Sequence, residues 1–129
     1  MLNQPDIAKL LLRLALGVLM LFHGYGKLIH GIGPIEAMLV AKGLPAFLAL
    51  GVYIGEIVAP LMLIAGVQVR IAALLVTGNM VVAIVLAHLG DVFALSAHGG
   101  WQLELQGFYL FTAVALILLG GGKYGVQKS

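Results

Sequence analysis

The chain has no cysteine among its 129 residues. This absence excludes disulfides, thiolate nucleophiles, iron–sulfur clusters held by cysteine and covalently attached haem. Any redox chemistry must therefore use a bound cofactor, a quinone or a partner protein.

Charged residues are also scarce. They make up 9% of the chain, against roughly 25% in soluble domains, while 62% of the residues are hydrophobic and the mean hydropathy is +1.12. The seven Lys and Arg residues are scattered singly and form no basic patch, so we expect no nucleic-acid partner. This composition predicts an integral membrane protein whose main partner is the lipid bilayer.

Long apolar runs fill most of the chain. Crossing a hydrocarbon core takes about 20 helical residues, and four runs have this length: residues 7–27, 46–66, 70–89 and 104–120. They lack the alternation of barrel strands, and backbone groups in lipid must pair within a helix. The pattern predicts an all-α, integral membrane four-helix bundle forming one domain, residues 1–129. The first run lacks a signal-peptide cleavage pattern, so we expect it to stay as the first helix.

Basic residues are distributed unevenly between the two sides of such a bundle. Five would lie with the termini and two on the other side, which predicts that both termini are cytoplasmic. The first outer loop, "GPIEAMLVAKGLP", predicts a short amphipathic helix on the outer surface, with Pro34 in its first turn and Gly43 as its stop. The basic residues with the termini are Lys9, Arg13, Arg70, Lys123 and Lys128, and those opposite are Lys27 and Lys42.

Glu56 lies near the middle of the second apolar run. An acidic residue at that depth costs about 2.5–3.5 kcal/mol on insertion scales, so either its carboxyl is protonated or a cation pairs with it. Pro60 has no N–H and leaves the carbonyl of Glu56 without its helical partner. Two interpretations remain open: a functional site, or a structural kink with a hydrogen bond between helices.

Arg13 in the first run is the expected partner of Glu56. Gly24 and Lys27 fall within about 40° of Arg13 around a helix, so polar groups would share one face that points into the bundle. The alternative is that Arg13 and Lys27 extend toward the headgroups on their own sides of the membrane.

Polar side chains also gather where the runs meet the outer side. We expect them to form a pocket whose floor is Glu56, with His23 and Glu56 as its catalytic residues and with Glu56 and Glu104 passing protons. Against this, helix ends collect polar residues in any membrane protein. The residues concerned are His23 and Lys27 in the first run, His88 in the third and Glu104 in the fourth.

Metal and phosphate sites find little support. No H-x-x-E-H or similar spacing places two metal ligands on one helix, so we expect no metal and no haem. The "GGGKYG" close lacks the pattern of a phosphate-binding loop and is expected to end the last helix. Close helix contacts are predicted at four glycines: Gly17, Gly24, Gly51 and Gly55.

Three segments carry a family resemblance: "LLLRLALGVLMLFHGYGKL", "GEIVAPLMLIAG" and "ELQGFYLFTAVALILLGGGKYGV". Their most specific parts are Arg13 with "FHGYGK", Glu56 in "GEIVAP", and the "GGGKYG" ending. They resemble the DoxX family of small four-helix membrane proteins, which is related to a membrane subunit of a thiosulfate:quinone oxidoreductase. The resemblance implies a multi-pass protein of the prokaryotic cytoplasmic (inner) membrane, linked to a redox system.

The expected function is that of a membrane subunit that binds a quinone or couples a partner oxidoreductase to the quinone pool. If it is an enzyme at all, it should not be active alone, because the chain carries no thiol or cofactor of its own. Homo-oligomers through the glycine faces are conceivable. The alternatives are a passage for a small solute or protons, and a structural anchor for a partner enzyme. The expected quinone-binding residues are Arg13, His23, Lys27, Tyr53, His88 and Glu104, with Phe22, Tyr25 and Phe108 flanking the ring.

Overall fold

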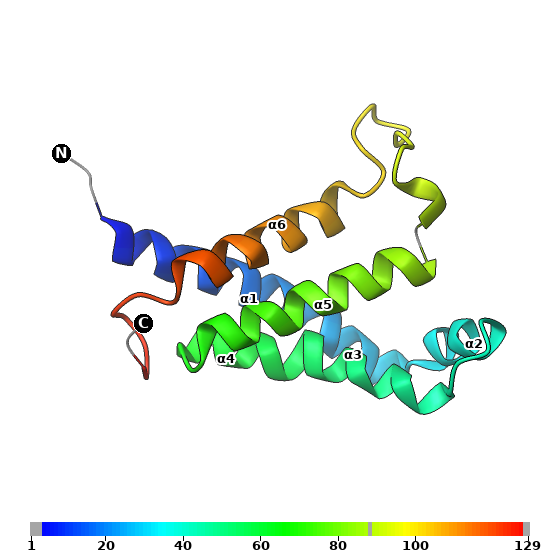
Figure 1. Ribbon diagram of the computed structural model, residues 1–129, viewed down its shortest axis with the longest axis horizontal. Helices are drawn as coiled ribbons and strands as arrows, with labels where there is room; N and C mark the ends of the chain where they lie inside the picture. The colour runs from blue at the N-terminus through cyan, green and yellow to red at the C-terminus, as the bar shows by residue number, and fades with distance from the viewer. Residues whose placement is uncertain (1–3, 88, 128–129) are drawn as a thin grey trace.

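The computed structural model describes residues 4–87 and 89–127 as helices joined by short connections (Figure 1). This described part contains no β-strand, only an isolated β-bridge between Leu95 and Trp101. The prediction of an all-helical chain is therefore confirmed. The elements are α1 (Pro5–His30), α2 (Gly33–Ala41), η1 (Ala46–Leu50), α3 (Gly51–Tyr53), η2 (Ile54–Val58), α4 (Ala59–Ala65), α5 (Val69–Ala87), η3 (Leu89–Asp91) and α6 (Glu104–Leu119).

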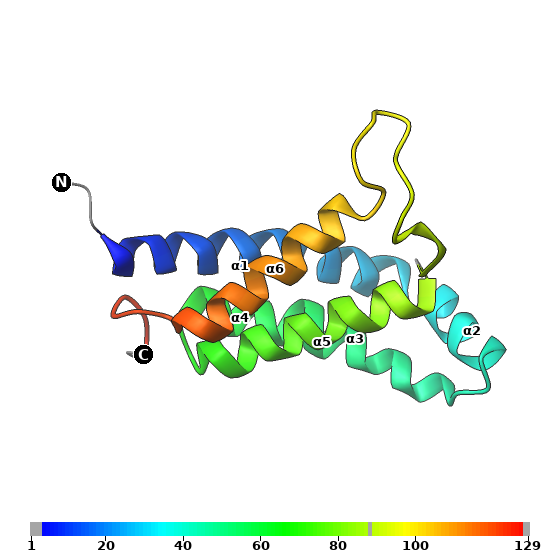
Figure 2. The ribbon, with the colours of Figure 1, turned by 45° about the horizontal axis from the view of Figure 1, so that its top comes forward.

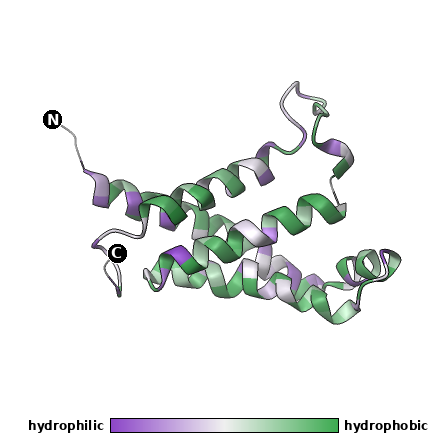
Figure 3. Ribbon diagram, in the orientation of Figure 1, coloured by the Kyte–Doolittle hydropathy of each residue, from purple (hydrophilic) through white to green (hydrophobic). Residues whose placement is uncertain are grey.

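All four predicted apolar runs are helical. The second is a composite rod, in which η1, α3, η2 and α4 follow one another without a break. Three helical stretches are long and apolar enough to cross a membrane: Pro5–His30, Ala46–Ala65 and Val69–Leu86. The fourth, Glu104–Leu119, is apolar but shorter. Hydrophobic residues, drawn in green, predominate along these rods (Figure 3).

The rods pack along one another, α5 against α6 and α1 against α4 (Figure 1 and Figure 2). Leu16, Leu63 and Leu116 fill the core between them. Large apolar side chains also cover the outside, as Phe111 at 67% and Leu118 at 77% exposure illustrate. Lipid is a good solvent for such a surface, so the helices can be apolar all round.

The two ends of the chain lie at the same end of the bundle. The backbone N–H of Lys123 donates to Asp6 Oδ1 over 3.2 Å, and that of Val126 donates to the carbonyl of Ala65 over 2.9 Å. The opposite end carries α2 and the loop before α6 (Figure 1). This arrangement agrees with the prediction that both termini lie on one side of the membrane. That this side is the cytoplasmic one stays a prediction.

The segment predicted as a short helix is α2. Its Leu39 packs with Ile32 and Ala49 in a small second core at this end. Gly43 ends the turn that follows, with φ of +78°, a conformation that glycine adopts without strain. The placement of α2 on a membrane surface stays a prediction.

Glycines allow the rods to touch at three of the four predicted positions. A Cβ atom at Gly17 would lie 2.9 Å from the carbonyl oxygen of Pro60, and one at Gly24 would overlap the carbonyl oxygen of Glu56. A Cβ at Gly55 would lie 2.5 Å from the Cβ of Asn79. Gly51 has no heavy atom within 4 Å of that position, so the prediction is wrong there.

Candidate functional site

Glu56 lies in an irregular turn of the composite rod. Residues Ile54–Val58 form a π-helical turn, in which the N–H of Ala59 donates to the carbonyl of Ile54, five residues earlier. Pro60 supplies no N–H to the regular ladder, which accounts for an irregularity at this point. Such turns are rare and occur often at functional sites. The turn presents the side chain of Glu56, only 3% exposed, to the interior of the bundle.

Lys27 of α1 is the partner of Glu56. Its Nζ atom lies 2.7 Å from Oε1 and 2.6 Å from Oε2 of the carboxylate. The Lys27 side chain is 33% exposed and that of Glu56 4%, so the pair joins a buried carboxylate to a cation that reaches the surface. Gly24, one turn earlier, lets α1 approach the backbone of η2 closely enough for this contact.

Asn79 of α5 also binds this carboxylate. Its Nδ2 donates to Glu56 Oε2 over 3.1 Å, and Gly55 leaves the space for the two helices to meet there. The sequence analysis did not assign Asn79 to the site. Its position could have predicted a contact between helices, because an amide in the middle of an apolar span needs a hydrogen-bond partner.

His23 and Tyr109 form a second polar contact beside the ion pair. The Tyr109 hydroxyl and His23 Nε2 lie 3.2 Å apart, with the two rings edge to face at a centroid distance of 5.6 Å. His23 lies one helical turn before Lys27 on α1, so this contact adjoins the ion pair. Tyr109, which the sequence reasoning also missed, thus brings α6 to the site. We call His23, Lys27, Glu56, Asn79 and Tyr109 the polar cluster.

Of the other predicted site residues, some lie near the polar cluster and some do not. Tyr53 lies beside the cluster and donates its hydroxyl to the carbonyl of Lys27 over 3.4 Å. Glu104 is exposed and lies against Gly100 of the preceding loop, so it does not join the cluster. His88 lies outside the described residues. The aromatic residues Phe22, Tyr25 and Phe108 are 69%, 61% and 74% exposed, so none of them is buried in the cluster.

The predicted Arg13–Glu56 pair is wrong. Arg13 is buried, with 1% exposure, and binds backbone carbonyls instead. Its Nε donates to Leu63 over 3.0 Å and its guanidinium nitrogens to Ile64, Gly121 and Tyr124. The alternative of a side chain extended to the headgroups is also wrong, because these contacts hold Arg13 inside the bundle.

Arg13 donates hydrogen bonds to backbone carbonyls in two places, the last turn of α4 and the segment that follows α6. The last turn of α4 leaves carbonyls without helical partners, and a cation there is favourable. The same guanidinium fastens the segment that follows α6. Four of its five N–H donors are engaged, and about 21 Å of helix rise separates it from Lys27. Arg13 is therefore a structural clamp at the end of the bundle away from the polar cluster.

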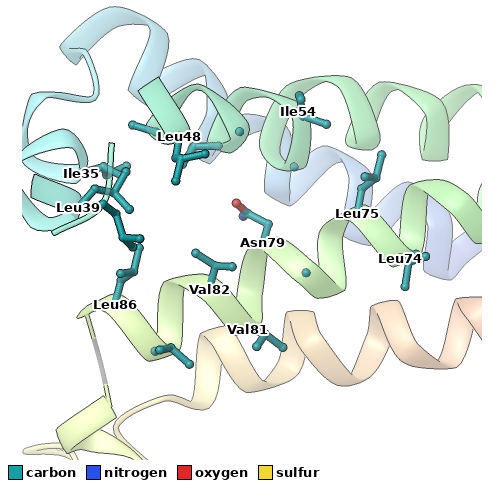
Figure 4. Close-up of a pocket in the computed structure, with 17 residues that line it drawn as sticks. Ile35, Leu39, Leu48, Ile54, Leu74, Leu75, Asn79, Val81, Val82 and Leu86 are labelled. Carbon is teal, nitrogen blue, oxygen red and sulfur yellow. The ribbon is translucent and has the colours of Figure 1, made fainter. Parts of the chain in front are cut away.

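An apolar cavity of about 690 Å³ borders the cluster, between the composite rod and α5 (Figure 4). Asn79 is the one polar side chain among the described residues that line it. Its walls are otherwise aliphatic, with glycines at Gly51, Gly55 and Gly78. Across the described part of the chain, no three His, Asp or Glu side chains come together as a metal site would require. The arrangement therefore offers an apolar space that meets a polar, charged interior at one amide.

Comparison with known proteins gives one result. The DoxX family model matches residues 8–89, a range that contains four members of the polar cluster: His23, Lys27, Glu56 and Asn79. No curated protein and no solved structure matches the chain.

Proposed function

Since the chain belongs to the DoxX family, we propose that it is a membrane-embedded component of a redox system that binds a quinone from the bilayer. Its apolar helices make it a multi-pass membrane protein. The observation that carries the proposal is the position of Asn79, which belongs to both the polar cluster and the wall of the apolar cavity.

The cavity suits the apolar part of such a ligand. Its volume of about 690 Å³ lies within the range of about 300–1,000 Å³ usual for small-molecule pockets. Six of its lining residues are 45–59% exposed: Leu48, Ile54, Leu74, Val81, Val82 and Val85. A molecule dissolved in the bilayer can therefore reach the cavity from the side without crossing water.

The polar cluster suits the exchange of protons. Reduction of a quinone takes two electrons and two protons, and we assign the transfer of these protons to Glu56 and His23. Lys27 neutralises Glu56 when it is charged, and Tyr109 orients His23 through their contact. The electrons must come from or go to a partner oxidoreductase, because the chain carries no thiol. We propose accordingly that the chain is not active alone.

Lipid analysis of purified protein tests this proposal. The protein is purified in mild detergent, its bound lipids are extracted, and quinones are quantified by mass spectrometry. Gly78→Leu should fill the cavity, because open space surrounds Gly78 in its wall, and should lose the quinone. Gly26→Leu is the matched control, since Gly26 also lies on a helix with open space around it and does not line the cavity.

Two results would contradict the proposal. One is that wild-type protein retains no quinone and binds none when it is added. The other is that Gly78→Leu and Gly26→Leu retain as much quinone as wild type. Either result would turn attention to a solute or proton passage, measured as flux into liposomes.

A further inference from the structure

The amide of Asn79 has a fixed orientation. An asparagine side chain carries an amide nitrogen with two N–H donors and a carbonyl oxygen that accepts, and Nδ2 of Asn79 donates to Glu56 Oε2 over 3.1 Å. The carboxylate of Glu56, already paired with Lys27, can only accept. The opposite orientation would place two oxygen atoms against each other, so the chemistry of Glu56 decides which way the amide points.

The Asn79 carbonyl oxygen consequently faces away from the ion pair. It accepts no hydrogen bond from any residue within 4–87 and 89–127. Figure 4 shows the amide pointing from α5 into the space between α5 and the composite rod. An acceptor without a donor in apolar surroundings is unfavourable, and a ligand that brings a donor removes this cost.

No other polar side chain of the described residues lines the cavity. The side-chain hydrogen-bonding groups of this space are therefore those of one amide: the acceptor Oδ1, which has no donor, and the N–H of Nδ2 that Glu56 does not use. A quinone carries acceptors only and leaves Asn79 Oδ1 without a donor. A quinol carries hydroxyl groups and can donate to the same atom.

We infer that the cavity binds the reduced, hydroxyl-bearing form of its ligand, a quinol, in preference to the quinone, through a hydrogen bond from a quinol hydroxyl to Asn79 Oδ1. This inference rests on the proposed function and adds which redox form the site selects. Glu56 and Lys27 act here as positioning residues, because they hold the amide in the orientation that makes the site an acceptor.

Equilibrium binding under anaerobic conditions tests the inference. Protein in nanodiscs of saturated lipid is dialysed against a short-tailed ubiquinone analogue, its quinol, or the dimethyl ether of that quinol, and bound ligand is quantified by mass spectrometry. Wild type should bind the quinol about fivefold more tightly than the quinone, the effect of one net hydrogen bond. The dimethyl ether, which keeps the ring but has no donor, should bind like the quinone.

Two variants test whether the Asn79 amide, and not the cavity alone, causes the preference for the quinol. Asn79→Leu should reduce quinol affinity about fivefold to the quinone level and leave quinone affinity unchanged. Glu56→Gln keeps Asn79 but supplies a donor to its oxygen, so the amide can turn its Nδ2 toward the cavity. In that variant the preference should move toward the quinone. Circular dichroism checks that each variant keeps its helices.

The outcomes distinguish the inference from the proposed function. Equal affinity of wild type for quinol and quinone would overturn the inference and leave quinone binding intact. A quinol preference that persists in both Asn79→Leu and Glu56→Gln would overturn it too, because the selecting group would lie elsewhere. Binding of neither form would overturn both.

Discussion

Lys27 and Glu56, 29 residues apart in the sequence, form an ion pair in which one ammonium group contacts both carboxylate oxygens. The carboxylate is almost fully buried and the ammonium is partly exposed. Removing one partner of such a pair leaves an uncompensated charge, which costs more than the pair itself contributes. This asymmetry can be measured.

Breaking the pair should destabilise the bundle. We expect Lys27→Met to lower the free energy of unfolding by about 2 kcal/mol, less than the ~3–5 kcal/mol of a fully buried pair, because Lys27 is partly exposed. The Lys27→Met/Glu56→Gln double variant should recover at least half of this loss. Unfolding by SDS, followed by circular dichroism, measures both. Equal losses in the single and double variants would mean that the buried charge of Glu56 is not what destabilises Lys27→Met.

The crossing of α1 and η2 should depend on Gly24. A Cβ there would overlap the carbonyl of Glu56 and lie 2.6 Å from Ile57 Cγ1, so Gly24→Ala should cost about 1–3 kcal/mol through strain. Gly26→Ala on the same helix meets no atom within 4 Å and should be neutral or slightly stabilising, since alanine is the better helix former. Thermal unfolding of the two variants compares them directly, and equal midpoints would refute the close crossing.

The segment after α6 should be held by Arg13. Arg13→Gln removes contacts to the carbonyls of Gly121 and Tyr124, and one such charge-assisted bond contributes about 1.5–3 kcal/mol. Trypsin should then cleave after Lys123 roughly tenfold faster than in wild type. Arg70→Gln is the control, because Arg70 donates to Ile117 within α6 and not to this segment. The clamp would be disproved by equal cleavage rates in wild type and Arg13→Gln.

The orientation in the membrane can be tested with introduced cysteines, since the chain has none of its own. The excess of basic residues at the end that carries the termini predicts that this end is cytoplasmic. A membrane-impermeant maleimide added to intact cells should therefore label Ala97→Cys, in the loop before α6, and label Gln68→Cys only after permeabilisation. The reverse pattern would show the opposite orientation. Both side chains are exposed, so access to the thiol does not limit either reaction.

The sequence anticipated much of the polar cluster, but it assigned Glu56 to the wrong cation. Angles around α1 place Arg13 and Lys27 on one face and do not say which of them lies level with Glu56. The packing decides this: α1 and the composite rod run antiparallel, with Gly17 against Pro60 and Gly24 against Glu56. In this register Arg13 meets the end of α4, and Lys27 meets Glu56.

Asn79 and Tyr109 were missed for the same reason. Each lies on an apolar helix whose own pattern does not show which side faces the other rods. A hydrogen bond between helices depends on the relative rotation and height of both, and neither is recorded in one helix alone. The cavity beside Asn79 likewise depends on how the composite rod and α5 pack, because residues of both line it.

The amino-acid sequence by itself determined the class of protein, the helices and the presence of a buried carboxylate that needs a partner, because insertion into lipid depends on local hydropathy and on backbone pairing within each segment. Only the tertiary structure decided which groups meet that carboxylate, because contacts between helices depend on packing at a few small residues. The same packing turned Arg13 from an expected site residue into a clamp, and placed Asn79 between the charged interior and the apolar cavity.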